Sequence, residues 1–210
     1  MSALTGGDVK LEKNFSQYGN WLNTLATTDP ESWKNRVQLW FTKSVTIDSR
    51  EEYSENSTVQ KEPPEEIDQE IEGLFEIAKE QIFEDGMESE FSRELISIIK
   101  EYGNDAMIVI ANLIVTDQVN AEVASEALRW LGHVDHPKTY RYRLWVLERS
   151  LYCSSVRIRD GAVLGLSFLN DPHAISYLKQ AIERETCKEL REDMEQVLAH
   201  LENTQQCHSS

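Results

Sequence analysis

The sequence predicts an all-α fold in which helical hairpins stack into an α-solenoid. Apolar residues recur at helical spacing through most of the 210 residues, and only 9 Gly and 5 Pro interrupt them. A pattern of small, aliphatic and turn residues also repeats after 35 positions. Repeats of about 30 to 47 residues that contain helix pairs are typical of α-solenoids, because one pair cannot bury its apolar face without a neighbour.

Residues 1–43 are expected to form an N-terminal helical hairpin. The first helix has apolar residues at helical spacing, from Phe15 to Leu25. Thr28-Asp29-Pro30 then supplies a capping residue and a Pro for the first helical position, and a second stripe begins at Trp33 and ends at Phe41. These aromatic stripes are interpreted as packing residues.

Residues 44–64 are predicted to form an acidic mobile linker, since they are rich in Ser, Thr and Glu and contain Pro63-Pro64. The next segment, 65–84, has the pattern of an amphipathic helix. Its expected core face is Ile67, Ile71, Leu74, Phe75, Ala78, Ile82 and Phe83, and its outer face carries Glu66, Glu70, Glu76 and Glu80.

The repeat is clearest where residues 127–142 align with residues 162–177. Ala127, Leu131 and Pro137 correspond to Ala162, Leu166 and Pro172. Each copy is interpreted as a helix, a short turn with Pro, and a second helix. Gly161 and Gly165 are four residues apart, which favours close packing of two repeat helices. A degenerate copy is expected before this region, a half copy after it, and a disordered tail at 203–210.

Residues 156–166, VRIRDGAVLGL, followed by Asn170-Asp171-Pro172 and Leu178, resemble the HEAT-like repeats of the phycobilisome-lyase type. The resemblance covers about residues 90–202. It implies a right-handed α-solenoid of HEAT-like helical hairpins. Together with the amphipathic helix at 65–84, the solenoid is expected to span residues 65–202, and residues 1–43, which the resemblance does not cover, are expected to form an N-terminal helical extension. It is weakly specific for function, because one scaffold carries many activities.

The charge excludes several classes of partner. The net charge is -16 and the pI is about 4.7, so the surface repels nucleic acid and anionic membranes. Residues 44–94 alone hold 17 acids and four bases. The longest apolar run, 106–115, has ten residues, whereas a membrane span needs about 20, and the first 14 residues have no apolar run of the kind a signal peptide contains. A cytoplasmic location is therefore expected.

Residues with catalytic or metal-binding chemistry are scattered. Cys153, Cys187 and Cys207 have spacings that fit neither a zinc motif nor a disulfide framework. His133, His136 and His173 lie near predicted turns without a recurring fourth ligand. The sequence therefore predicts no catalytic residues, no metal and no cofactor.

Two surfaces are candidates for binding a partner. One is the acidic outer face formed by Glu66, Glu70, Glu76 and Glu80. The other is a basic stretch, 137–159, with a local charge of +5, in which Arg141, Trp145 and Arg149 are expected to project together. The family resemblance would place Arg141 and Trp145 on a concave surface. The arginines are nearly as well explained by ion pairs with the acidic helix at 65–84.

These observations favour a non-catalytic protein-binding module that binds, and in one form inhibits, a basic protein partner, as immunity proteins for nuclease toxins do. An adaptor role fits the sequence equally. The alternative, which rests on the family resemblance, is a bilin-lyase-like enzyme or a chromophore-binding chaperone. Recognition of damaged nucleic-acid bases by a HEAT-like solenoid conflicts with the overall charge. The oligomeric state is left open.

Overall fold

The structure is a computed structural model that describes residues 65–84, 86–116 and 118–208. The chain divides into two units, residues 1–59 and residues 60–210, and the described residues all lie in the second. The predicted N-terminal hairpin, 1–43, and the predicted linker, 44–64, lie outside the described residues.

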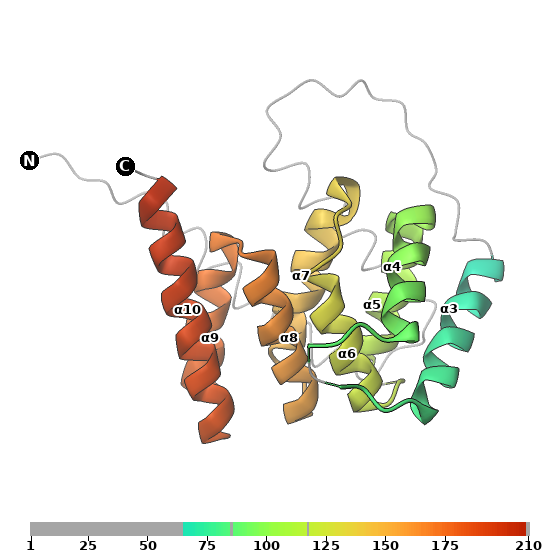
Figure 1. The fold of residues 1–210 in the computed structure, drawn as a ribbon. Helices are drawn as coiled ribbons and strands as arrows, with labels where there is room; N and C mark the ends of the chain where they lie inside the picture. Colours follow the sequence, from blue (N-terminus) through green and yellow to red (C-terminus); the bar gives the residue numbers. More distant parts are fainter. Residues whose placement is uncertain (1–64, 85, 117, 209–210) are drawn as a thin grey trace, which may run out of the picture. The chain divides into compact units, whose positions relative to one another are not determined.

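Every regular element among the described residues is helical (Figure 1). The α-helices are α3 (Glu65–Ile77), α4 (Glu90–Tyr102), α5 (Asn104–Val115), α6 (Ala121–Leu131), α7 (Tyr140–Ser150), α8 (Val156–Leu169), α9 (Ile175–Arg184) and α10 (Lys188–His208). Three short 3-10 helices are η1 (Ala78–Glu80), η2 (Pro137–Thr139) and η3 (Pro172–Ala174). The prediction of an all-α fold is therefore confirmed over the described part of the chain.

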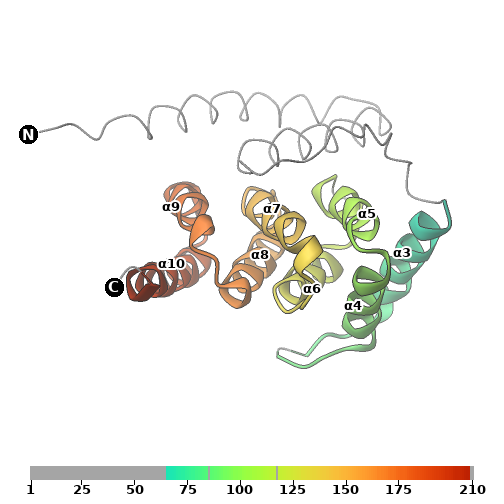
Figure 2. The ribbon, with the colours of Figure 1, turned by 90° about the horizontal axis from the view of Figure 1, so that it is seen from above.

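The helices of this unit form two rows. Viewed from above, α4, α6, α8 and α10 lie in one row and α5, α7 and α9 lie in the other (Figure 2). Neighbours in the first row are in contact, with α6 packed most extensively against α8, and α5 packs against α7 in the second row. Helix α3 packs against both α4 and α5 at one end of the rows.

The elements follow the 35-residue offset that the sequence shows. Helices α6 and α8 begin at Ala121 and Val156, and α7 and α9 begin at Tyr140 and Ile175. The N-termini of α6 and α8 are both capped by a side chain. The Asn120 side chain accepts a hydrogen bond from the Glu122 amide at 2.8 Å, and the Ser155 side chain accepts one from the Ile158 amide at 3.4 Å. Sequence repeat and structural repeat are thus in the same register.

Glycines allow α6 and α8 to pack closely. A Cβ atom on Gly161 would lie 2.5 Å from the main-chain oxygen of Ser125, and one on Gly165 would overlap the main chain of Leu128 and the Leu147 side chain. Only a residue without a side chain fits at such an approach. The interpretation of these two glycines as helix-packing positions is confirmed.

The core next to α3 is aromatic. Phe75 is 1% exposed and packs edge to face on Phe91, with ring centroids 5.2 Å apart and the ring planes at 86°. Ile67 and Ile71 from the same face of α3 are also buried. Burial of this stripe leaves the opposite side of α3 to solvent.

Two boundaries differ from the sequence-based expectation. Helix α3 ends at Ile77 rather than near residue 84, because the backbone becomes extended at Gln81 after the short η1 helix. Ile82, expected in the core, is consequently 92% exposed. At the other end, α10 continues to His208, so residues 203–208 are helical where a disordered tail was expected.

Candidate functional site

The acidic outer face of α3 is exposed as the sequence predicts. Glu66, Glu70 and Glu76 lie on α3 and Glu80 lies on η1, and all four side chains are exposed. Within α3 the last turn has no basic residue. We call these four residues the α3 acidic face.

The local negative potential also acts on a neighbouring phenol. The nearby carboxylates of Glu101 and, next in importance, Glu70 raise the pKa of Tyr102, because a second negative charge is unfavourable beside them. A cationic group approaching this side of the molecule is attracted by the same field.

The arginines of the basic stretch 137–159 act largely inside the molecule. Arg157 binds Glu122 at 2.7 Å and Asp160 at 3.0 Å, and so joins the first turns of α6 and α8. Arg159 forms a two-point ion pair with Glu185, with distances of 2.7 and 2.8 Å. These arginines do pair with acids of the same chain, but Glu122, Asp160 and Glu185 lie in α6, α8 and the α9–α10 connection rather than in α3.

Arg143 is another structural arginine, and its side chain is buried. It donates to the main-chain oxygen of Leu131 at 2.8 Å and to Thr139 Oγ1 at 3.3 Å. Burial lowers its pKa. Arg143 therefore ties the end of α6 to the start of α7.

The three predicted binding residues on α7 do not form one exposed patch. Arg141 is exposed and Arg149 is half-buried, but Trp145 is only 5% exposed. The expectation that Arg141 and Trp145 project together is thus wrong for the indole, because α7 contacts α5, α6 and α8 and buries more than one stripe. Trp145 belongs to the packing of the helices.

A cluster of tilted aromatic rings at the C-terminal ends of α6 and α8 was missed by the sequence analysis. The His133 ring lies between Trp130, at 4.8 Å between centroids, and Phe168, at 3.8 Å. Burial, followed by the charge of Arg129, lowers the pKa of His133. The signal in the sequence was the 35-residue offset, which puts Phe168 and His133 at the ends of equivalent helices.

The histidines do not converge on a metal site. His133 packs against aromatic rings, His136 Nδ1 lies 3.2 Å from Thr139 Oγ1, and His173 Nδ1 lies 2.8 Å from Asp171 Oδ1. Within residues 65–84, 86–116 and 118–208, no group of three or more His, Cys, Asp or Glu side chains is arranged to hold a metal ion.

Cys153 lies beside the Arg159–Glu185 ion pair. Arg159 Nη1 donates to the main-chain oxygens of Cys153 and Ser154, both at 2.9 Å. Glu185 in turn accepts from the amides of Thr186 and Cys187, both at 2.9 Å. These bonds fasten the connection before α8 to the connection before α10, which is a structural role.

Two acidic side chains are buried in the helix rows. Glu126 on α6 accepts from Trp130 Nε1 at 2.7 Å and pairs with Arg129 at 2.8 Å, although burial raises its pKa. Glu148 on α7 is 6% exposed, and burial raises its pKa to about 8. Glu148 is therefore largely protonated at neutral pH.

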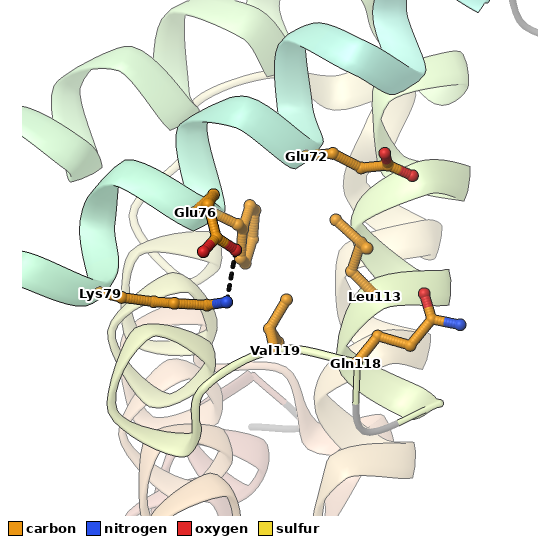
Figure 3. A pocket seen from close by; sticks show the side chains of 7 residues that line it. Glu72, Glu76, Lys79, Leu113, Gln118 and Val119 are labelled. Atoms are coloured by element: carbon orange, nitrogen blue, oxygen red, sulfur yellow. Dashed lines mark hydrogen bonds and ion pairs between the residues drawn. The ribbon is translucent and has the colours of Figure 1, made fainter.

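A small pocket lies between α3, η1 and the end of α5 (Figure 3). Its volume is ≈ 250 Å³, below the roughly 300–1,000 Å³ of pockets for small organic molecules. We call it the α3–α5 pocket. It is lined by Glu72, Phe75, Glu76, Lys79, Leu113, Gln118 and Val119.

In the described part of the chain, no helix combines the length and the apolar character that crossing a membrane requires. Comparisons of the chain with protein-family models, with curated proteins and with solved structures found no match.

Proposed function

We propose that this chain is a non-catalytic protein-binding module, an acidic scaffold that binds a basic protein partner. In this proposal the two rows of helices are a right-handed α-solenoid of HEAT-like hairpins. The common 35-residue offset of α6 with α8 and of α7 with α9 supports a repeat architecture. Such scaffolds present extended surfaces and commonly act by binding.

The observation that carries the proposal is the exposure of the α3 acidic face. Glu66, Glu70 and Glu76 are exposed on α3, which is anchored to the core by Ile67, Ile71 and Phe75, and Glu80 is exposed on the adjoining η1. The face is therefore held in place by packing. A rigid array of like charges steers an oppositely charged partner and increases its association rate, by about 10 to 1,000-fold at low salt.

Inhibition of the partner is the concrete form that we favour. A protein with a net charge of -16 is suited to cover a cationic cleft, as immunity proteins do, and an adaptor would use the same face without blocking activity. Arg141, which is exposed, and Arg149, which is half-buried, are candidates for a second contact on α7. Trp145 is no longer included, since it is buried.

The test uses the full chain as bait in affinity capture followed by mass spectrometry. A quadruple variant, Glu66→Lys, Glu70→Lys, Glu76→Lys and Glu80→Lys, is compared with the unchanged chain. The matched control reverses four exposed acids at the other end of the unit, Glu183, Glu192, Asp193 and Glu195. Both variants change the charge equally, so only a difference between them reports on location.

We expect the unchanged chain and the control variant to recover the same basic protein, and the α3 variant to lose it. Recovery that is equal in all three would contradict the proposal for this face. Recovery of a partner with an acidic pI would contradict the proposed chemistry of the partner.

A further inference from the structure

We propose that an exposed apolar band across α6 and α8 is the docking site for a basic amphipathic helix of the partner protein. The band consists of Met87, Trp130, His133, Leu164 and Phe168, and we call it the α6–α8 band. The inference rests on the proposed function for the basic character of the partner. It adds an apolar contact on elements other than those of the α3 acidic face.

The band is continuous from α8 to α6. The His133 ring lies 3.8 Å from the Phe168 ring and 4.8 Å from the Trp130 ring, measured between centroids. Leu164 precedes Phe168 by four residues, which places both on one face of α8. Side chains from two helices thus form one surface near the ends of these helices.

The connection between α3 and α4 extends the band beyond α6. Figure 2 shows this connection running outside α6, and Arg129 fastens it there. Arg129 Nη2 donates to the main-chain oxygen of Met87 at 3.3 Å, and its guanidinium carbon lies 5.6 Å from the centre of the Trp130 ring. Arg129 is itself paired with Glu126 at 2.8 Å, so this junction adds no uncompensated positive charge to the band.

The apolar surface of the band is open to solvent. Met87 is 59% exposed, Phe168 is 49% exposed and Leu164 is 37% exposed. The pKa of His133 is lowered, first by burial and then by the charge of Arg129, so its ring is uncharged at neutral pH. A contiguous exposed apolar surface of this kind marks an interaction site in a soluble protein.

The charges beside the band favour a basic occupant. Glu84 and Glu88 flank Met87 in the connection, and both carboxylates are exposed. Among the residues that the structure describes, neither has an ion-pair partner. A second copy of this chain, with its net charge of -16, would bring like charges together at such a contact. A partner with Lys or Arg beside its apolar residues is attracted instead.

An amphipathic helix combines these two requirements. Its apolar stripe would cover Leu164, Phe168 and Met87, and cations beside the stripe would face Glu84 and Glu88. Methionine and aromatic side chains suit this mode of binding, because they offer a large and adaptable apolar contact. Burial of the band would slow dissociation, whereas the α3 acidic face accelerates association.

The experiment measures binding of fluorescent model peptides to the full chain by anisotropy. The basic peptide has Leu at helical spacing and Lys at the other positions. A scrambled peptide has the same composition without an apolar face, and an acidic peptide has Glu in place of Lys. We expect the basic amphipathic peptide to bind at least about tenfold more tightly than either of the others.

Three variants change the band or its rim. Leu164→Gln with Phe168→Gln removes the apolar surface of α8 and should weaken binding of the basic peptide by about tenfold. Met87→Gln changes the connection alone, so it tests the band independently of packing on α8, and about threefold is expected. Glu84→Gln with Glu88→Gln should weaken binding by about threefold at low salt and by less at high salt.

The matched controls are placed outside the band. Ile77→Gln with Ile82→Gln removes two exposed apolar side chains, which are 68% and 92% exposed. Glu192→Gln with Glu195→Gln removes two exposed charges on α10. We expect either control to change binding by less than about twofold. Melting curves establish that all variants are folded.

Equal binding of the basic and the scrambled peptide would overturn the inference, as would unchanged binding in the α8 variant and in Met87→Gln. A loss in the isoleucine control as large as that in the α8 variant would show unspecific apolar binding and would also overturn it. Sedimentation velocity tests the other occupant. Self-association of the unchanged chain that is lost in the α8 variant would show that a second copy covers the band.

The band variants leave the α3 acidic face intact, so the two proposals can fail separately. If the α8 variant binds the basic peptide normally while reversal of the α3 acidic face abolishes capture of the partner, only the α6–α8 band is refuted. If the α8 variant loses the peptide while reversal of the α3 acidic face leaves capture unchanged, only the role of that face is refuted.

Discussion

The Cα of Gly161 on α8 faces the main chain of Ser125 on α6 so closely that a Cβ atom at position 161 would lie 2.5 Å from the Ser125 oxygen and 2.6 Å from its Cα. Main-chain atoms cannot move aside as a flexible side chain can. The contact between the two helices therefore depends on the absence of a side chain at this position.

Replacement of Gly161 by Ala is expected to destabilise the unit by about 1–3 kcal/mol, because the added methyl group forces α6 and α8 apart. Chemical denaturation measures the change. Gly73→Ala on α3 is the control, since a Cβ there meets nothing within 4 Å. Alanine has the higher helix propensity, so Gly73→Ala should stabilise the protein by about 0.5–1 kcal/mol. A neutral Gly161→Ala would disprove the close helix contact.

The Arg159–Glu185 ion pair is predicted to contribute far more than the Arg157–Glu122 pair, although both have an N···O distance of 2.7 Å. The side chains of the first pair are 12% and 1% exposed, and those of the second are 42% and 60% exposed. Glu185→Gln should cost about 3 kcal/mol, because it leaves a largely buried guanidinium without its counter-charge. Glu122→Gln should cost less than about 1 kcal/mol. Equal losses in urea unfolding would refute this ranking.

The same ion pair predicts part of the acid sensitivity. The hydrogen bond from Arg159 lowers the pKa of Glu185 below its ordinary value. A carboxyl whose pKa is lower in the folded state stabilises that state above its unfolded pKa, and this contribution is lost as the pH falls through the folded pKa. Unfolding of Glu185→Gln should therefore depend less on pH below about pH 5 than unfolding of the unchanged chain. Parallel acid titrations of the two proteins would contradict this assignment.

Glu148 predicts a loss of stability on the alkaline side. Burial raises its pKa to about 8, with the Asp171 carboxylate also raising it and Arg149 acting in the opposite direction. The folded protein then retains a proton that the unfolded chain releases near pH 4.5, so stability falls as the pH rises from about 4.5 to about 8. Each unit of pKa difference is worth about 1.4 kcal/mol.

Glu148→Gln removes this ionisation while keeping the shape. The variant should be more stable than the unchanged chain at pH 9, by a few kcal/mol, and the difference should shrink toward pH 5. Urea unfolding at both pH values measures it. A difference that is independent of pH would show that Glu148 is not the titrating group.

Much of the fold could be predicted because equivalent residues recur 35 positions apart in the sequence. The correspondence of Leu131 with Leu166 and of Pro137 with Pro172 predicts equivalent helices and turns, and α6 to α9 follow it. The glycines at 161 and 165 were informative because a residue without a side chain has a specific use in a helix. Local pattern and tertiary packing agree in this region.

The errors arise where packing overrides periodicity. The apolar pattern from Ile67 continues to Phe83, and Phe83 does pack near Phe91, at 5.8 Å between centroids. The chain reaches that contact through extended backbone at Gln81, which the spacing of apolar residues cannot reveal. The exposure of Trp145 was predicted wrongly because α7 packs against other helices on more than one side. The spacing of apolar residues within a single helix does not reveal how many helices will pack against it.

Of the candidate surfaces, the acidic one could be predicted from residue type and spacing alone, since carboxylates on the outer side of an amphipathic helix are exposed. The partners of Arg157 and Arg159 could not, because Glu122 and Glu185 are 35 and 26 residues away and meet them only after the helices stack. The α3–α5 pocket likewise combines residues from α3, η1, α5 and the loop after α5.

The central claim is that the α3 acidic face binds a basic protein, and the most direct measurement is the association rate constant of the captured partner at low and high salt. For the unchanged chain and for the control variant with four reversed acids on α9 and α10, the rate should be high and should fall steeply with salt. For the variant with Lys at positions 66, 70, 76 and 80, it should be at least about tenfold lower at low salt and nearly independent of salt. Identical rates and salt dependences for the α3 variant and the unchanged chain would contradict the account.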